Sequence, residues 1–350
     1  MWAVRFAAYT LSFQYRQKGY NRTAARCEIL IFKESRMQLN LPFQRKATGN
    51  EVHLSGRRFM ILAAVIPTLV FYAIWLVIPM VYSIIGSFYE WNPLAAQAPF
   101  VGLQNFVEAL TKDPLVGLTL SNTLYYAIVT IPVGAALALF VAVMVNSLPR
   151  FVGLYRVIYF IPVVTSVVAV SVIWRWLYQP RFGLFNQVLR LILVDVLGLS
   201  VNPTVQWLTS KQLAMPSVMA MVIWQGIGFT MVIFLAGLTS IPREFYEASK
   251  IDGAGAWQRF RFITIPLLQP TMIFVLVTGL IGGMQVFTPM YVMTQGGPAN
   301  VTKTIVFHLY EKAFSTYRFG YASSLAFILF GIILAFTLVQ FRFLRTRWQY

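Results

Sequence analysis

The sequence is poor in charged residues and in the residues that build metal and redox sites. Only 11% of its 350 residues are Asp, Glu, Lys or Arg, whereas a soluble domain averages about 25%. The single cysteine, Cys27, excludes an internal disulfide framework, and two histidines as far apart as His53 and His308 offer no zinc ligand set. Redox and metal chemistry are therefore not indicated.

Acidic residues are the scarcest charged group, with 11 Asp and Glu against 28 Lys and Arg and a net charge of +17. Such an excess could indicate a nucleic-acid binder, but the basic residues lie between long apolar runs and form no single patch. Because 58% of the residues are hydrophobic, a soluble fold could not hide the apolar surface. The composition predicts an integral membrane protein.

Six stretches of the chain are long and apolar enough to cross a bilayer. A spanning helix needs about 20 largely apolar residues, because every backbone amide must be satisfied within the segment. Prolines such as Pro132 and Pro162 are tolerated where neighbouring helices re-satisfy the freed carbonyls, which favours a packed bundle. The sequence therefore predicts an all-α integral membrane protein with six transmembrane helices, over residues 59–87, 123–145, 151–177, 213–238, 270–291 and 321–341.

The distribution of Lys and Arg predicts the orientation of this bundle, because basic residues concentrate in cytoplasmic segments. With the N-terminus inside, 11 basic residues precede the first span and nine lie in the other predicted cytoplasmic segments, which leaves eight of the 28 on the outer side. Both termini are therefore expected in the cytoplasm.

The first 58 residues contain no sustained apolar period, and we interpret them as a basic cytoplasmic tail. No apolar core with a small-residue cleavage site follows the charges, which argues against a secretory signal. Met37 is an alternative start of translation. If translation begins there, part of residues 1–36 is not part of the natural protein. The predicted organisation is a basic tail over 1–58, a transmembrane domain over 59–341 and a short basic tail over 342–350.

The loop over residues 239–266, between the fourth and fifth spans, has the signals of two short helices rather than of a simple connector. Pro242 suits the first turn of a helix, and an acidic residue such as Glu247 favours its N-terminal half. Gly253 and Gly255 then provide a stop at which a positive φ is available.

A second helix can run from residue 256 to about residue 263, with Trp257, Phe260 and Ile263 in an apolar stripe at a spacing of three. Two interpretations of the loop are open. The helices form a hairpin on the lipid headgroups, or they form a docking element that enters a groove of another protein.

The same loop resembles a cytoplasmic signature of ABC importer permeases, in particular those of the sugar branch related to the maltose permease. That signature is Glu-Ala-Ala, three residues, Gly, nine residues, then Ile-x-Leu-Pro. This chain keeps the spacing throughout, with Ser249 in place of the second Ala and Ile265 in place of Leu. The matching residues are Glu247, Ala248, Ser249, Gly253, Ile263, Thr264, Ile265 and Pro266.

Further segments extend the resemblance over residues 59–341. Segments similar to sugar-type permeases follow the first span, precede the second, open the third and follow the fifth, at residues 100–106, 122–123, 156–162 and 294–298. Taken alone, the Gly-Gly-Pro of the last segment is only a turn signal.

The resemblance implies a permease subunit that translocates a carbohydrate across the bacterial cell (inner) membrane. The implied partners are a second permease subunit, two ATP-binding cassette ATPase subunits and an extracytoplasmic sugar-binding protein. Since the chain has no Gly-x-x-x-x-Gly-Lys-Ser/Thr phosphate loop, we do not expect it to be an enzyme or to bind a cofactor. ATP and Mg belong to the partner ATPase subunits.

By the same resemblance, the 239–266 loop sits in a cleft of the ATPase and couples ATP hydrolysis to transport. We expect Glu247 and Asp252 to pair with basic residues there and Gly253 to allow a sharp bend. The alternative is that these acids are solvated charges at a helix start. The predicted coupling residues are Glu247, Ala248, Ser249, Asp252, Gly253, Ala254, Ile263 and Pro266.

Polar and aromatic groups within the fourth and fifth spans are candidates for the sugar path, because a lone polar group is unfavourable against lipid. Where the maltose permease has asparagines, this chain has Val222, Gly283 and Val286. The chain therefore binds a different sugar or lacks a transmembrane site, and helix packing is the alternative role for each candidate. Three candidates come from this polarity argument and two from the resemblance: Trp224, Gln225 and Gln285, then Phe229 and Gly283.

An ion- or proton-coupled secondary transporter is the alternative function. Such transporters usually need an ionisable residue within the membrane. None lies in the central parts of the six predicted spans, which disfavours this class. A non-transporting membrane scaffold is a third alternative and would not need the coupling signature.

Overall fold

The computed structural model describes residues 54–148, 150–199 and 204–343, most of which are helical. The chain divides into two compact units, Met1–Tyr72 and Ala73–Tyr350. The predictions for residues 1–53 and 344–350, which include most of both tails, lie outside the described residues.

The described element of the first unit is helix α3 (Leu54–Tyr72). It begins before residue 59, where the first span was predicted, and therefore takes in the end of the predicted tail. The difference arises because apolar patterning marks the membrane-embedded part of a helix, whereas Arg57 and Arg58 extend the same helix beyond it.

The second unit consists of α-helices and short π-helical segments, written η. An isolated antiparallel bridge also joins Tyr89 to Phe100. In chain order, its helical elements are η2 (Ala73–Val77), α4 (Ile78–Gly86), α5 (Gln104–Val107), η3 (Glu108–Lys112), α6 (Pro114–Asn146), α7 (Val152–Val164), α8 (Val167–Leu177), α9 (Leu184–Arg190), η4 (Leu191–Val196), α10 (Ala214–Ser240), α11 (Arg243–Ile251), α12 (Ala256–Arg259), η5 (Phe260–Thr264), α13 (Ile265–Leu267), α14 (Gln269–Met284), α15 (Thr288–Met293), α16 (Ile305–Tyr310), η6 (Glu311–Ser315) and α17 (Phe319–Phe343).

The predicted all-α membrane fold is confirmed. Four helical stretches in the described part are long and apolar enough to cross a membrane: Met60–Gly86, α6, α10 and α17. Two bent pairs raise the number of spans to six if each pair is one span. The first pair is α7 with α8, bent by 91°, and the second is Ala256–Leu267 with α14, bent by 65°.

Several predicted span ends differ from the helix ends. Helix α6 begins at Pro114 rather than at Thr123, because the Asp113 side chain caps it by accepting a hydrogen bond from the N–H of Leu115 at 3.0 Å. The fifth predicted span is interrupted, since α14 ends at Met284 and α15 begins at Thr288. At 33 residues and 1.5 Å per residue, α6 is about 50 Å long, which exceeds the hydrocarbon core of about 30 Å.

Small residues allow the central helices to pack closely. Helix α10 packs against α6 and α7, and α14 packs against α6 and α17. Ala138 and Ala142 of α6 are fully buried against α10 residues such as Phe234. A Cβ added at Gly228 would collide with the carbonyl group of Tyr159 on α7, so only glycine permits this approach.

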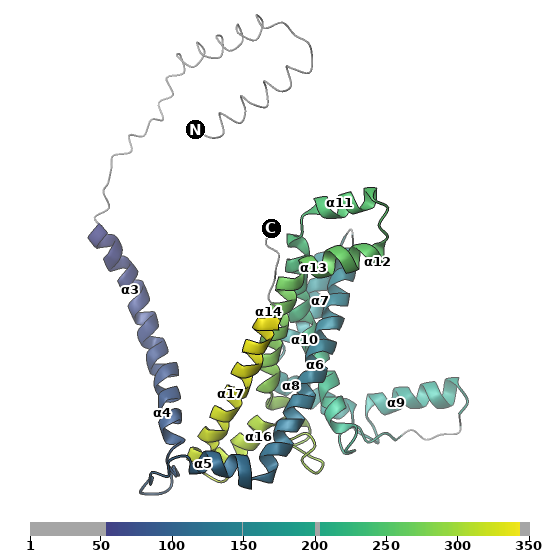
Figure 1. Cartoon of the computed structure of the whole chain (residues 1–350). Helices are drawn as coiled ribbons and strands as arrows, with labels where there is room; N and C mark the ends of the chain where they lie inside the picture. The colour runs from purple at the N-terminus through teal and green to yellow at the C-terminus, as the bar shows by residue number, and fades with distance from the viewer. Residues whose placement is uncertain (1–53, 149, 200–203, 344–350) are drawn as a thin grey trace, which may run out of the picture. The chain divides into compact units, whose positions relative to one another are not determined.

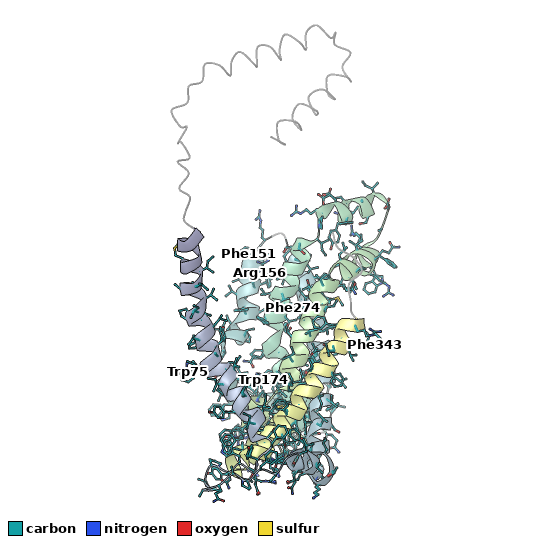
Figure 2. All side chains as sticks on the ribbon, turned by 60° about the vertical axis from the view of Figure 1, so that its left-hand side comes forward. Trp75, Phe151, Arg156, Trp174, Phe274 and Phe343 are labelled. Carbon is teal, nitrogen blue, oxygen red and sulfur yellow. The ribbon has the colours of Figure 1, made fainter. Side chains whose placement is uncertain are left out.

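The connecting segments gather at two ends of the second unit. Helices α11, α12 and α13 lie at one end, whereas α5, α9 and α16 lie at the other (Figure 1). Figure 2 shows Phe151 and Arg156, at the start of α7, near the end that carries α11. Segments predicted to share a membrane side thus lie at the same end of the bundle.

Candidate functional site

Helix α11 ends in a tight turn at Gly253. The N–H of Gly253 donates to the carbonyl of Lys250 at 3.1 Å, and the N–H of Ala254 donates to the carbonyl of Ser249 at 2.9 Å. These two bonds define a Schellman motif, in which the residue after the helix takes a left-handed conformation. The φ of Gly253 is +77°, so the predicted positive φ is confirmed there.

Gly255 does not share this conformation, because its φ of −68° and ψ of 169° are extended. It precedes α12, and its N–H donates to the side-chain oxygen of Gln258 at 2.7 Å. Two glycines in the same turn therefore have different roles, one as the end of a helix and one as the start of the next.

The two helices of the loop are fastened to each other and to the bundle. The hydroxyls of Tyr246 and Thr264 lie 3.0 Å apart and form a hydrogen bond between α11 and η5. The buried hydroxyl of Ser249 donates to the carbonyl of Tyr246 at 2.8 Å. Ile241 and Leu268, at the two ends of the loop, are buried in the same apolar cluster. The loop is therefore a packed extension of α10 and α14.

The opposite face of α11 is exposed and carries the predicted coupling charges. Ile251 is 88% exposed, and Glu247, Asp252 and Gly253 beside it are also exposed. Within the described part of the chain, neither Glu247 nor Asp252 forms an ion pair. A large apolar side chain and two free carboxylates are thus available to a partner.

The remaining predicted coupling residues occupy mixed positions. Ala248 and Pro266 are exposed, Ala254 and Ile263 are half-buried, and Ser249 is buried. In the predicted stripe, the rings of Trp257 and Phe260 lie 5.6 Å apart, but Trp257 remains 69% exposed. A groove of about 380 Å³ lies here, lined by Trp257, Phe260, Arg261, Phe262 and Ile265.

A cavity of about 400 Å³ lies among α6, α10 and α14. Val222, Gly283 and Val286, the three positions at which the maltose permease has asparagines, all line it. The structure therefore brings these positions together, although none of them offers a polar side chain. Hydroxyl-bearing residues on the lining are Tyr126, Thr130, Thr230 and Thr288, and glycines are Gly134, Gly226, Gly279, Gly282 and Gly283.

Gln225 lies outside this lining and supplies hydrogen bonds at the break between α7 and α8. Its side-chain amide donates to the carbonyls of Pro162 and Thr165 at 3.3 and 3.1 Å. These carbonyls lie at the 91° bend between α7 and α8, where regular helical bonds are lost. This arrangement gives Gln225 a structural task, and its part in the sugar path stays a prediction.

Three other predicted pathway residues, Trp224, Phe229 and Gln285, also lie outside the cavity lining. The Trp224 ring lies 5.4 Å from that of Trp174, and Trp224 is 45% exposed. Phe229 is 55% exposed on the same helix. Gln285 is exposed at the break after α14. Of the five candidates, Gly283 is the one that lines the cavity.

One of the sequence segments that resembled sugar-type permeases, residues 122–123, contacts the residues that follow the Gly-Gly-Pro segment, at the end of the bundle opposite α11. The Asn122 side chain donates to the carbonyls of Asn300 and Lys303 at 2.8 and 3.0 Å. The Thr123 hydroxyl accepts from the N–H of Ile305 at 3.0 Å. The turn that follows the Gly-Gly-Pro segment is therefore held on α6.

A charged cluster at the same end was missed by sequence reasoning. Asp113 accepts hydrogen bonds from His308 Nε2 at 2.9 Å and from the Tyr321 hydroxyl at 2.8 Å. Beside it, Arg318 makes a bidentate pair with Glu108, with both bonds at 2.7 Å. These partners are about 200 positions apart in sequence, so no local pattern could have revealed them.

The cluster shifts the acidity of its members. Burial alone would raise the pKa of Asp113, but hydrogen bonds from His308, Tyr321 and the N–H of Leu115 lower it to about 2. Burial lowers the pKa of His308, against the opposing effect of Asp113. The hydrogen bonds from Arg318 lower the pKa of Glu108. The cluster therefore joins α6, α16 and α17 through a charged carboxylate.

Comparisons with known proteins agree with this architecture. The family described as "Binding-protein-dependent transport system inner membrane component" matches residues 119–348. A probable ABC transporter permease protein of Pyrococcus horikoshii is 34% identical over 269 residues, which cover 77% of this chain and 90% of that protein.

Two relatives are named for their substrates. The lactose transport system permease protein LacF of Rhizobium radiobacter is 31% identical and covers 81% of this chain and 93% of its own length. The diacetylchitobiose uptake system permease protein NgcF of Streptomyces coelicolor is 32% identical and covers 86% of this chain and 84% of its own length.

The fold is also shared with a solved membrane transporter. A chain of a bacterial alginate ABC transporter, solved with an alginate-bound periplasmic protein, matches with a TM-score of 0.71 at 22% identity and covers 83% of this chain and 95% of that one. Together, these findings support the ATP-driven importer rather than the ion- or proton-coupled alternative. The chain is a multi-pass ABC transporter permease and belongs to the family of binding-protein-dependent transport system inner membrane components.

Proposed function

We propose that this permease subunit imports a carbohydrate across the bacterial inner membrane and that its 239–266 loop docks on ATPase subunits in the cytoplasm. The observation that carries the docking role is the exposed face of α11, where the 88% exposed Ile251 is flanked by Glu247 and Asp252. An apolar anchor with a charged rim is the usual composition of a protein interface. Glu247 and Asp252 pair with basic residues of the ATPase. Both termini of the chain lie on the cytoplasmic side as well.

The partners of this chain in the proposal are a second permease subunit, two ATPase subunits that hold ATP and Mg, and an extracytoplasmic sugar-binding protein. The carbohydrate class is supported by relatives named for lactose, sulfoquinovosyl glycerol and diacetylchitobiose. The resemblance to sugar-type permeases and the names of these relatives both favour a carbohydrate substrate.

We also propose that the sugar passes through the cavity among α6, α10 and α14. Its hydroxyl groups can exchange hydrogen bonds with a sugar, and its glycines leave room beside the helix backbones. Because Val222 and Val286 replace asparagines, contact with a sugar there is weaker and less specific than a site rich in amides would provide.

The docking role is tested with Ile251→Ser in the complete transporter in reconstituted vesicles. We expect the variant to insert normally but to lose ATPase co-purification, because the exposed apolar anchor is removed. Leu94→Ser is a matched control, since Leu94 is 74% exposed in the segment between α4 and α5 and not in the 239–266 loop. Equal ATPase recovery with Ile251→Ser and with the parent would refute docking through this face.

The sugar path is tested with Gly282→Leu, which fills the cavity from α14. A Cβ at Gly282 meets no heavy atom within 4 Å, so the helix tolerates the side chain. We expect reduced sugar uptake with normal recruitment of the ATPase. Gly331→Leu on α17 is the control, because its Cβ position is equally free. Unchanged uptake by Gly282→Leu would remove the cavity from the path.

A further inference from the structure

Helix α9 and segment η4 follow α8 and are unused by the transport function proposed above. Asn186 fixes their start to the segments that precede and follow them. Its side-chain amide donates to the carbonyls of Pro180 and Val205, both at 3.0 Å, and its oxygen accepts from the indole N–H of Trp207 at 2.9 Å. From this anchored start, α9 extends away from the bundle at the end opposite α11 and α12 (Figure 1).

One face of this segment is apolar and uncovered. Its residues recur at the spacing of a helical face, and their side chains are 52, 44, 55 and 46% exposed: Leu184, Val188, Leu191 and Ile192. Gln187 and Arg190 lie on a different, polar face of the same helix. A continuous apolar stripe of this kind is unfavourable in water and is typical of helices that lie in a membrane surface.

The surroundings of the stripe have the composition of a membrane–water interface. Trp176, in the last turn of α8, is 69% exposed, and Phe182 is 63% exposed. Exposed aromatic and basic side chains together mark the headgroup level of a bilayer. Between residues 175 and 197, the one acidic residue, Asp195, is outnumbered by three exposed arginines: Arg175, Arg181 and Arg190.

The basic excess decides between lipid and protein as the covering partner. Anionic phospholipid headgroups attract such arginines, and each basic residue near the surface contributes to binding. Apolar residues of the preceding helix α8 are exposed as well, with Val172 and Ile173 at 45 and 53%. A lipid surface would cover the stripe and the exposed residues of α8 alike, so a single partner accounts for both.

We propose that α9 and η4 form an amphipathic anchor in the membrane–water interface, with the apolar stripe among the acyl chains and the arginines at the phosphate groups of anionic phospholipids. Under the proposed topology, this surface is the outer leaflet. The opposite topology would place the same anchor in the other leaflet.

The test is site-directed spin labelling of the full chain in nanodiscs of phosphatidylcholine and phosphatidylglycerol, with Cys27 replaced by Ser. Val188→Cys and Leu191→Cys report on the stripe. Gln187→Cys and Arg190→Cys are neighbouring controls on the polar face. We expect the ratio of collisions with oxygen to collisions with a water-soluble nickel chelate to be several-fold higher for the stripe than for the controls.

Two outcomes would overturn the anchor. A stripe as accessible to the nickel chelate as the controls would lie in water, and a stripe shielded from both reagents would lie against protein. A second arm tests the arginines: omission of phosphatidylglycerol should make the Val188 label shallower in the parent but not in a variant with Arg175, Arg181 and Arg190 replaced by Gln. Equal lipid sensitivity of parent and variant would refute the arginine–phosphate contacts.

Discussion

Replacement of Gly253 by Val tests whether the turn between α11 and α12 must keep its shape for ATPase coupling. The φ of +77° lies in the left-handed region, which costs a residue with a side chain about 1–2 kcal/mol. Apart from chain neighbours, no heavy atom lies within 4 Å of a Cβ at this position, so the cost is conformational rather than steric. A cost of about 1–2 kcal/mol lowers the population of the native turn by a factor of about 5–30.

Two substitutions in the same turn are matched controls. Gly253→Asn should be tolerated, because Asn enters the left-handed region far more readily than Val. Ser249→Ala should also be tolerated, since the Ser249 hydroxyl donates only to a carbonyl within its own helix and Ala is the residue of the family signature. We therefore expect the order Val, then Asn, then parent for the loss of coupling at Gly253.

The assay combines ATPase co-purification with sugar-stimulated ATP hydrolysis in reconstituted vesicles. Gly253→Val should insert into the membrane like the parent, because the turn lies outside the packed bundle. Its ATPase recovery or its stimulated hydrolysis should fall by the factor given above. If Gly253→Val equalled the parent in both measurements, the coupling role would be refuted and the loop would be interpreted as a hairpin on the lipid headgroups.

Three further predictions address charge, orientation and acid stability. Glu247→Lys should give a membrane-inserted permease that recruits its ATPase poorly, because a like charge would then face a basic pocket; normal co-purification would refute the pairing. In a Cys27→Ser background, Gly255→Cys should be inaccessible to an impermeant thiol reagent added outside intact cells and Asn300→Cys accessible; the reverse would invert the topology. Because the pKa of Asp113 is lowered from 3.8 to about 2, its carboxylate stabilises the fold above pH 3.8 and this contribution is lost as the pH falls toward 2. The difference in thermal stability between the parent and Asp113→Asn, as monitored by thermal unfolding, should therefore shrink as the pH falls below about 4; a difference that did not shrink between about pH 4 and pH 2 would contradict the assigned pKa.

The membrane fold was predictable because apolar length and periodicity are local properties. The positive φ at Gly253 was predictable for the same reason, since a helix end followed by glycine is a local signal. The 91° bend after α7 was not, because Pro162 near the break looks no different in sequence from Pro132, at which α6 continues unbroken, and the compensating group, Gln225, lies on α10. The contacts of Asp113 with His308 likewise depend on tertiary packing, which leaves no trace in either local sequence.

The packing of the 239–266 loop onto its own two helices has a mechanical consequence. The hydrogen bond between Tyr246 and Thr264 makes α11 and η5 one stiff body, which is continuous with α10 on one side and with α14 on the other. Those same two helices both line the bundle cavity. A push on the loop therefore needs no relay of intermediate contacts, because tilting the stiff body moves α10 and α14 together relative to α6, which also lines the cavity.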